Sequence, residues 1–493
     1  MQGLAFCKKT IAINGADFGR FLAYFIICFL SMLMAYIGVV SYCAAAISKS
    51  SLALYAFPIL LLAIVFFFML ARYRHSHAWV FILIALPAVF GFGFFMLPGA
   101  VPDEPAHIYQ CAALLSRNSS GFEVPLAFSQ DYLPTNYAGA YEAITHGIGW
   151  DSTWICDRYL GSYFFHLYLI PGIILYLGQI LSVNPYVALV VARIAEGLFF
   201  IFVSFLLVKI MPYGKTPLVV FLLNPMLIQQ ETSCSADAIS LLVAISFIVY
   251  ALRLNSKEEL EKRDLICLAV LIFLLVTSKM LYAPLVLILF ILVKRVGERR
   301  TRILLYAAPT ALIIIAAIAC IVFYRGSFFP DAFDLMRQPL HCVRVFVKSI
   351  WEMTPFWIES YAGYNLGALT IHAWIPCFWV YMILQFVVLV YSDDAEPSSM
   401  IKSDRVIFGI AALVDFFLIL MTMRGWTLTH DLREDIIMGI QGRYLFPVFL
   451  PILLSILRPN FGKSKGNVLL TIAFFMVAIF GLDAYSVLTY FAV

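Results

Sequence analysis

Long, nearly uninterrupted apolar stretches recur along this 493-residue chain and restrict its fold more than any other feature. A helix needs about 20 mostly apolar residues to cross a bilayer, and many of the stretches approach or reach that length. Hydrophobic residues make up 63% of the chain and charged residues only 13%, too few to cover a water-soluble surface. The stretches do not alternate apolar and polar residues, which argues against a membrane β-barrel. We therefore predict an all-α polytopic membrane protein.

Eleven stretches are predicted to be single spanning helices. They are 21–41, 51–71, 78–98, 187–208, 216–230, 238–254, 303–323, 371–391, 406–423, 443–457 and 467–490. The longer stretch 264–293 is interrupted at Lys279, and we interpret it as two short spans that meet there. The segment 161–183 carries Pro171 and Gly172 near its middle. Because proline disrupts a helix interior, we predict a re-entrant or interface-lying helix broken at Pro171.

Basic residues predict the side of the membrane on which each loop lies. Lys8, Lys9 and Arg20 precede the first span and favour a cytoplasmic N-terminus. Loop 99–160, with seven acidic and two basic residues, then falls outside. If 161–183 does not cross, fifteen Lys and Arg residues in five later short loops all lie inside. The sequence thus predicts about 13 spans, with the N-terminus inside and the C-terminus outside.

We divide the chain into three parts. These are an N-terminal two-helix hairpin at 1–77, a transmembrane module at 78–323 with outer loop 99–160, and a C-terminal region at 324–493 with outer loop 324–370. Both outer loops are long enough to have structure of their own. The short loops 231–237 and 424–442 join them on the outer face. Any chemistry is therefore expected on that face.

The string Pro102-Asp103-Glu104-Pro105-Ala106-His107 directly follows the third span. Its prolines restrict the backbone on both sides of the two carboxylates. A partly desolvated carboxylate at the membrane rim can have its pKa raised to a value useful for a general base. Asp103 and Glu104 are therefore the candidate catalytic residues. The alternative is structural, with Asp103 capping the helix that begins near Pro105 and Glu104 in its first turn.

Two further charged residues lie at breaks between apolar stretches. Asp237 ends the polar string Ser233-Cys234-Ser235-Ala236-Asp237, and the alternative to a binding role is a cap for the helix 238–254. Lys279 lies between two apolar runs, where a lysine is costly unless it reaches water or an anion. It either binds an anion or extends to the outer interface.

The string Gln441-Gly442-Arg443-Tyr444 opens the span at 443–457. The Arg443 guanidinium suits a phosphate, and Gly442 would let a ligand approach the backbone. The alternative is an interfacial arginine beside an interfacial tyrosine. Two carboxylates and two cations are thus predicted to converge on one membrane face. Such a set suits group transfer from a membrane-held phosphate, with a base for the acceptor hydroxyl and cations for the leaving phosphate.

Arg193 and Glu196 lie one helical turn apart inside the span 187–208. Side chains at this spacing lie on the same helix face. We expect them to form a charge pair that stabilises the bundle, or to face the same cavity.

Four segments, in this order, resemble a bacterial membrane family known as domain of unknown function 2142. They are PDEPAH at 102–107, LLNPMLIQQETSCSADAIS at 222–240, GALTIHAWIP at 367–376 and QGRYLFPVFLP at 441–451. The resemblance covers most of the chain after residue 95, and the two spans before it look like an added hairpin. The third segment departs from the family pattern, since Ala368-Leu369-Thr370 stands where an aromatic and an acidic residue are expected.

That family in turn resembles the glycosyltransferase-C superfamily, whose members use polyprenyl-phosphate-linked sugar donors. The resemblance implies that Asp103 is a general base and that Glu104 orients it or helps the acceptor. The residues then expected to bind substrate are His107, Asp237, Lys279, Gln441, Arg443 and Tyr444. Within this set, Lys279 and Arg443 would contact the donor phosphate. Some members of the superfamily need a divalent cation between their carboxylates, so Mg²⁺ or Mn²⁺ is an open alternative.

The sequence therefore predicts an inverting glycosyltransferase, active on the outer face of a bacterial cytoplasmic membrane. Its partners would be a polyprenyl-phosphate-linked sugar, a glycan acceptor and the lipid bilayer, with no nucleic acid. The aromatic residues expected to be exposed for stacking on sugar rings are Trp150, Trp154, Trp357 and Tyr361. One alternative is a transporter or flippase for lipid-linked glycans. Another is an O-antigen-type polymerase or ligase that uses Arg325, Arg337 and Arg344 on a lipid pyrophosphate.

Overall fold

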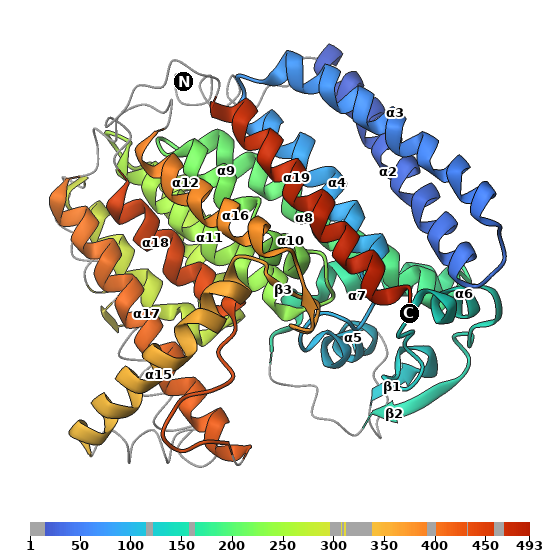
Figure 1. The fold of residues 1–493 in the computed structure, drawn as a ribbon. Coiled ribbons are helices and arrows are strands. Elements are labelled where there is room, and N and C mark those ends of the chain that lie inside the picture. Colours follow the sequence, from blue (N-terminus) through green and yellow to red (C-terminus); the bar gives the residue numbers. More distant parts are fainter. Residues whose placement is uncertain are drawn as a thin grey trace.

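The computed structural model describes residues 15–114, 122–156, 163–295, 338–391, 401–430, 432–457 and 468–493, with the isolated positions 307, 310 and 311. These residues form a helical bundle with two small antiparallel hairpins (Figure 1). Seven of the described helices are long and apolar enough to cross a membrane. They are α2 (Gly15–Cys43), α3 (Lys49–Tyr73), α4 (His77–Phe95), α8 (Pro185–Ile210), α11 (Ala236–Asn255), α17 (Lys402–Thr429) and α19 (Val468–Phe491). The prediction of an all-α polytopic membrane protein is confirmed.

The centre of the bundle is built on close packing between α4 and α8. A Cβ placed on Gly93 of α4 would lie 2.5 Å from the Ile194 side chain, and one on Gly197 of α8 would lie 2.5 Å from Val89. Small residues of this kind let two membrane helices approach closely. The α4–α8 contact fixes the position of Arg193, which contributes to the site described below.

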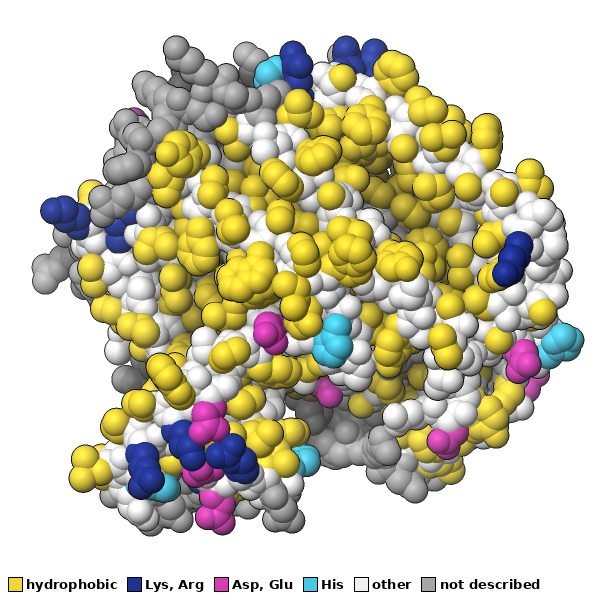
Figure 2. Space-filling model, viewed as in Figure 1, with side chains coloured by type: hydrophobic (Ala, Val, Ile, Leu, Met, Phe, Trp, Pro, Cys, Tyr) yellow, Lys and Arg dark blue, Asp and Glu magenta, His cyan; other side chains and the backbone are white. Residues whose placement is uncertain are grey.

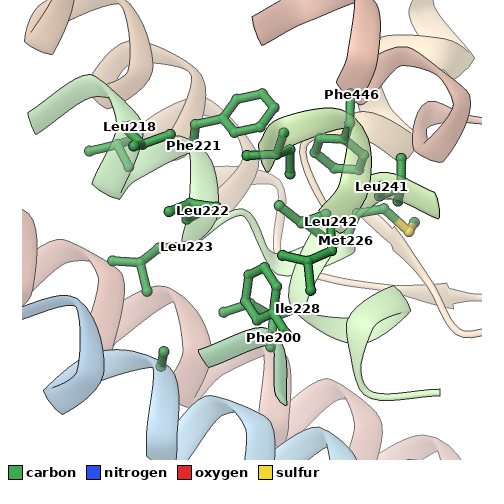
Figure 3. Close-up of a cluster of buried hydrophobic side chains, with 14 of the residues drawn as sticks. Phe200, Leu218, Phe221, Leu222, Leu223, Met226, Ile228, Leu241, Leu242 and Phe446 are labelled. Carbon is green, nitrogen blue, oxygen red and sulfur yellow. The ribbon is translucent and has the colours of Figure 1, made fainter. Parts of the chain in front are cut away.

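The segment 216–230 is not one spanning helix, and this part of the prediction is wrong. It forms two short helices, α9 (Lys215–Leu222) and α10 (Pro225–Glu231). Asn224 separates them because its side-chain oxygen caps α10 at the Leu227 N–H and Pro225 starts the new helix. Both helices are buried in the apolar core, where Phe221 packs against Phe446 (Figure 3). Because the segment is buried on all sides, its sequence is as uniformly apolar as that of a membrane-spanning helix.

Two more predicted spans are short helices in the structure. The stretch 371–391 gives α16 (Ile375–Val390). The stretch 443–457 gives one 3-10 turn, η4 (Gly442–Leu445), followed by α18 (Phe446–Ile456). An 11-residue helix rises about 16 Å, which is about half of the hydrocarbon thickness of a bilayer. The predicted span 303–323 lies outside the described residues apart from three isolated positions, so the total of 13 remains a prediction.

The interruption of 264–293 at Lys279 is confirmed. The helix α12 (Lys262–Ser278) ends there, and η3 (Met280–Arg295), a run of 3-10 geometry, follows. Lys279 itself has extended backbone angles, so the chain turns at this residue. The break brings the lysine side chain to the end of two apolar segments rather than to the middle of one.

The segment 161–183 contains the 3-10 turn η2 (Phe165–Tyr168) and the helix α7 (Leu169–Ile180). At 12 residues α7 is too short to cross a bilayer, which agrees with a re-entrant or interfacial helix. The predicted break at Pro171 is wrong, because Pro171 lies in the first turn of α7, where it displaces no helical hydrogen bond. Gly172 lets α7 pack on α5 (Glu104–Ala113), and Gly178 lets it pack on α8.

One end of the bundle, which we call the site face, carries α5, α6 (Tyr137–His146), α15 (Pro339–Tyr361) and both hairpins (Figure 1). In the first hairpin β1 (Phe122–Pro125) pairs with β2 (Thr153–Cys156), with Phe122 opposite Cys156. In the second, β3 (Asn365–Leu366) pairs with β4 (Ile371–His372). A small apolar cluster under the first hairpin includes Ile108, Val124 and Phe128. The described parts of loop 99–160 are therefore structured.

The sides of the bundle are apolar, as contact with lipid requires. Figure 2 shows hydrophobic side chains over most of the helical surface, with charged side chains gathered near its two ends. The hairpin of α2 and α3 lies at the periphery of the bundle (Figure 1), and α3 is the least buried of the seven long helices. This distribution supports contact between the helical sides and a bilayer.

Candidate functional site

Asp103 occupies the N-cap position of α5 but does not cap the helix with its side chain. Its φ of +62° is in the left-handed region, which Asp tolerates better than most residues. No capping hydrogen bond reaches its carboxylate. The carboxylate is instead 61% exposed and pairs with the guanidinium of Arg443. The PDEPAH string therefore turns the chain so that Asp103 faces away from its own helix.

Arg443, at the start of η4, is buried and joins three segments that are distant in sequence. One terminal nitrogen, Nη1, donates to the Pro102 carbonyl at 2.8 Å. The other, Nη2, donates to Asp103 Oδ2 and to the Tyr444 hydroxyl. Its Nε lies 3.2 Å from Asp237 Oδ2. Arg443 is therefore not an exposed arginine, because its guanidinium is buried between two carboxylates.

Asp237 lies in the first turn of α11, where Ser235 rather than Asp237 provides the cap. The Asp237 carboxylate is therefore free to bind cations. Its Oδ1 accepts a hydrogen bond from Lys279 Nζ. The lysine nitrogen also lies 5.1 Å from the centre of the Tyr444 ring, within range of a cation–π contact. The Lys279 side chain is only 10% exposed, and this ion pair compensates its burial.

These four residues, Asp103, Arg443, Asp237 and Lys279, form what we call the charge network. The charges alternate in sign along the network, and its two carboxylates balance its two cations. Asp103 is its exposed end, whereas the side chains of the other three are 1–10% exposed. The structure brings these four residues together at one end of the bundle, and it leaves Glu104 out of the network. An anion that entered beside Asp103 would meet both cations in a largely desolvated place, where electrostatic interactions are strong.

Glu104 faces the opposite way from Asp103 and is completely buried. Its carboxylate accepts hydrogen bonds from the backbone N–H groups of Gly99 at 2.9 Å and Cys234 at 3.1 Å. It also pairs with Arg193 Nε at 2.9 Å. These contacts join the start of α5 to the 231–235 turn and to α8. Glu104 therefore holds the loop that presents Asp103.

The expected pair between Arg193 and Glu196 is wrong. Arg193 pairs with Glu104 and donates to the Met96 carbonyl, at the end of α4. The Glu196 carboxylate is buried with no hydrogen-bond partner among the described residues. One helical turn allows the pair but does not require it, and the buried Glu104 is the partner that needs a cation.

Around the charge network lie three further residues of the predicted substrate-binding set: His107, Tyr444 and Gln441. His107 Nδ1 is 2.9 Å from the Tyr168 hydroxyl, and burial lowers the pKa of His107 to about 4. The imidazole is therefore neutral near pH 7 and adds no third cation. Tyr444 contacts both cations of the network through its ring. The Gln441 side-chain oxygen is buried without a hydrogen-bond partner in the described part of the chain.

Gly442 accommodates the protein backbone rather than a ligand, which corrects the prediction for this residue. A Cβ on Gly442 would lie 2.0 Å from the Tyr361 backbone nitrogen and 2.3 Å from the Ser360 carbonyl carbon. The Gly442 N–H donates to Ser360 Oγ at 2.8 Å. The C-terminal turn of α15 therefore sets the position of Arg443 through direct backbone contact.

We expect Gly442→Ala to prevent α15 from packing against η4, because backbone atoms at 2.0 Å cannot make room for a methyl group. The thermal unfolding temperature of the detergent-solubilised protein should fall clearly. Gly409→Ala on α17 is the matched control, since nothing lies within 4 Å of its Cβ position. Unfolding of Gly442→Ala at the wild-type temperature would contradict the observed packing.

The segments that carry the sequence resemblance contact one another in space. Gln229 of α10 exchanges two hydrogen bonds with the Gly367 backbone in the β3–β4 hairpin, at 2.8 and 3.3 Å. Asn224 Nδ2 donates to the Tyr361 carbonyl at 2.9 Å. Arg443 donates to the Pro102 carbonyl. The 222–240 segment thus supports the hairpin and α15, and α15 supports Arg443.

The aromatic residues expected to be exposed are mostly not. Trp357 and Tyr361 of α15 are buried, and Trp150 donates its indole N–H to the Val183 carbonyl at 2.6 Å. Their stacking on sugar rings is therefore not supported. Two tyrosines that the sequence did not single out, Tyr163 and Tyr168, lie against His107. Only their place within the 161–183 segment indicated a position near the site face.

The described residues do not offer a metal site at the charge network. No group of three or more His, Cys, Asp or Glu side chains comes together in the described residues. Arg443 contacts both Asp103 and Asp237 and holds the place where a bridging cation would have to bind. These residues do not fit the divalent cation that the resemblance left open.

The fold and the site thus define a polytopic helical membrane protein with a largely buried charge network at one end of its bundle. A family model described as predicted membrane protein (DUF2142) matches residues 155–453, and the chain belongs to this family. The match includes Asp237, Lys279 and Arg443, whereas Asp103 lies before its first residue. No curated protein and no solved structure matches the chain.

Proposed function

We propose that this protein is an inverting glycosyltransferase of the glycosyltransferase-C kind. It moves a sugar from a polyprenyl-phosphate donor to a hydroxyl of a cell-surface glycan or its lipid-linked precursor. The observation that carries the proposal is the charge network, in which the exposed carboxylate of Asp103 pairs with Arg443, and Asp237 links Arg443 to the second cation, Lys279. This arrangement has a base accessible from solvent and two buried cations for a phosphate.

In the proposed reaction the acceptor hydroxyl attacks the anomeric carbon from the face opposite the lipid phosphate. Asp103 takes the hydroxyl proton as the new C–O bond forms. The bond from the anomeric carbon to the phosphate oxygen breaks, and the phosphate leaves with the electron pair, so the anomeric configuration inverts. Arg443 and Lys279 stabilise the charge that develops on the phosphate.

The two cations of the network are already paired with carboxylates, and this pairing affects how a donor phosphate can bind. Arg443 binds Asp103, and Lys279 binds Asp237. A donor phosphate that binds both cations must compete with these carboxylates. We expect donor binding to weaken the hold of Arg443 on Asp103 and so to free the carboxylate for contact with the acceptor hydroxyl.

We further propose that the site face lies outside a bacterial cytoplasmic membrane. The support is the distribution of Lys and Arg, which favours a cytoplasmic position for the N-terminus and the short basic loops. Polyprenyl-phosphate sugars would then reach the site from the outer leaflet.

The test is sugar transfer in proteoliposomes, from synthetic polyprenyl-phosphate sugars to lipid-linked glycan acceptors. Lys279→Gln should lower the rate of the chemical step by about 10²–10³-fold, the usual cost of losing one such stabilising group. Lys257→Gln is the matched control, because Lys257 forms an ion pair with Asp264 as Lys279 does with Asp237, but away from the site. Equal rates for Lys279→Gln and wild type, both correctly folded, would refute the role of Lys279.

One observation favours transport of a lipid-linked glycan as the second candidate. Glu196, Asp415 and Asp483 are buried inside long apolar helices, with no hydrogen-bond partner for their carboxylates among the described residues. Ionisable groups at such positions often mark transport pathways. Translocation of a labelled lipid-linked glycan across the same proteoliposomes, with no sugar transfer, would establish this candidate instead.

No observation favours a polymerase or ligase. Of the three arginines considered for that function, Arg344 is exposed on α15 away from the network, and Arg325 and Arg337 lie outside the described residues.

A further inference from the structure

A cavity of about 680 Å³ lies on the site face between the 127–135 segment and α6. Tyr186 of α8 lines the cavity. The Tyr186 hydroxyl forms a 3.0 Å hydrogen bond with the hydroxyl of Tyr36. The side chains of Asp131, Tyr132 and Glu142 on its walls are exposed, so the cavity is open to solvent. Its volume is in the usual range of small-ligand sites.

The cavity walls suit a particular class of ligand. They carry the carboxylates of Asp131 and Glu142, the imidazole of His146 and the hydroxyl of Thr135, and none of the lining residues is Lys or Arg. Such walls accept hydrogen bonds from hydroxyl and amino groups and repel phosphates and carboxylates. The Tyr132 ring, half exposed, offers a face on which a sugar ring can stack. The charge is opposite to that expected of a donor-phosphate site.

The cavity is connected to the loop that presents Asp103. Leu133, on its wall, would lie 2.7 Å from a Cβ on Gly99, and Pro105 lies 3.6 Å from the same point. The Gln130 N–H donates to the Tyr109 hydroxyl of α5 at 3.0 Å. One wall of the cavity therefore packs directly on the segment 99–105.

We propose that this cavity binds the acceptor glycan, at sugars that are uncharged or carry free amino groups. The identity of the bound glycan as an acceptor rests on the glycosyltransferase function proposed above. The cavity holds sugars adjacent to the loop of Asp103 and selects against anionic sugars by the charge of Asp131 and Glu142. Donor and acceptor thus have separate sites of opposite charge.

The test measures binding by calorimetry to the full-length protein in nanodiscs, without any donor. Three soluble probes of equal length are compared: neutral tetra-N-acetylchitotetraose, its de-N-acetylated amino form, and anionic tetragalacturonate. The neutral and amino probes should bind at least tenfold more tightly than the anionic probe. Glu142→Lys should weaken the amino probe at least tenfold and strengthen the anionic one. Asp151→Lys is the control, because Asp151 is exposed in the same loop but does not line the cavity.

The outcomes separate the two proposals. Equal binding of all three probes, or no binding of any, overturns the cavity assignment, as does an Asp151→Lys effect equal to that of Glu142→Lys. Probe selectivity that responds to Glu142→Lys, in a protein that transfers no sugar, supports a glycan site and overturns the transferase. Transfer that persists unchanged in Glu142→Lys, although probe binding is lost, overturns the role of the cavity in acceptor binding.

Discussion

Asp103→Asn is expected to lower sugar transfer by about 10²–10⁴-fold in a correctly folded protein, the usual contribution of a general base. The amide has the shape of the carboxylate but cannot take the acceptor proton. Its oxygen can still accept a hydrogen bond from Arg443, so the geometry of the loop should survive. Because the Asp103 side chain is largely exposed and Arg443 keeps Asp237 as a counter-charge, the substitution should lower the unfolding temperature only modestly.

The measurement is single-turnover transfer in proteoliposomes, which separates the chemical step from donor binding. Asp151→Asn serves as the control, since it removes an exposed carboxylate from the same polar segment. A full rate for Asp103→Asn would show that Asp103 only starts α5.

The imidazole of His107 stays neutral above about pH 4, so the pH profile of the wild type should have no limb from this group near pH 6.5.

Glu104→Gln should destabilise the fold by about 3–5 kcal/mol, because it leaves the buried guanidinium of Arg193 without a counter-charge. Both side chains of the pair are completely buried. The free energy of unfolding in a mixed-micelle denaturation series would report the loss. The effect on stability should exceed that of Asp103→Asn, although the two residues are adjacent.

A second substitution tests the cause of this loss. Adding Arg193→Met to Glu104→Gln removes the unpaired charge and should recover part of the stability. The recovery cannot be complete, because Glu104 also accepts hydrogen bonds from the Gly99 and Cys234 backbone. A double variant that is less stable than either single variant would contradict the pairing described above.

Much of the fold can be predicted from the lengths of the apolar stretches, because a helix that crosses a bilayer must be apolar and must match the thickness of its hydrocarbon core. That logic fails where an apolar stretch is buried in protein instead of lipid. The 216–230 segment is apolar because α9 and α10 fill the core, and Asn224-Pro225 breaks it inside. Composition does not distinguish these two environments, and only the Asn-Pro pair signalled the break.

The site was predictable in part for a related reason. Asp103, Asp237, Lys279 and Arg443 each lie where an apolar stretch ends or is interrupted, and counting spans places them on one face. The pairing among them depends on packing that the sequence does not display. The same holds for Glu104, whose partner Arg193 lies on α8, and for Gly442, whose neighbour is the backbone of α15.

The charge network also bears on how the protein is made. Its members leave the ribosome in the order Asp103, Asp237, Lys279 and Arg443, and chains assemble broadly in the order of their synthesis. Lys279 can join Asp237 soon after both are inserted. Asp103 cannot pair with Arg443 until translation has added 340 further residues. The charge network is therefore complete only once Arg443 has been made, and a nascent chain that stops before Arg443 lacks the ion pair that holds the Asp103 turn.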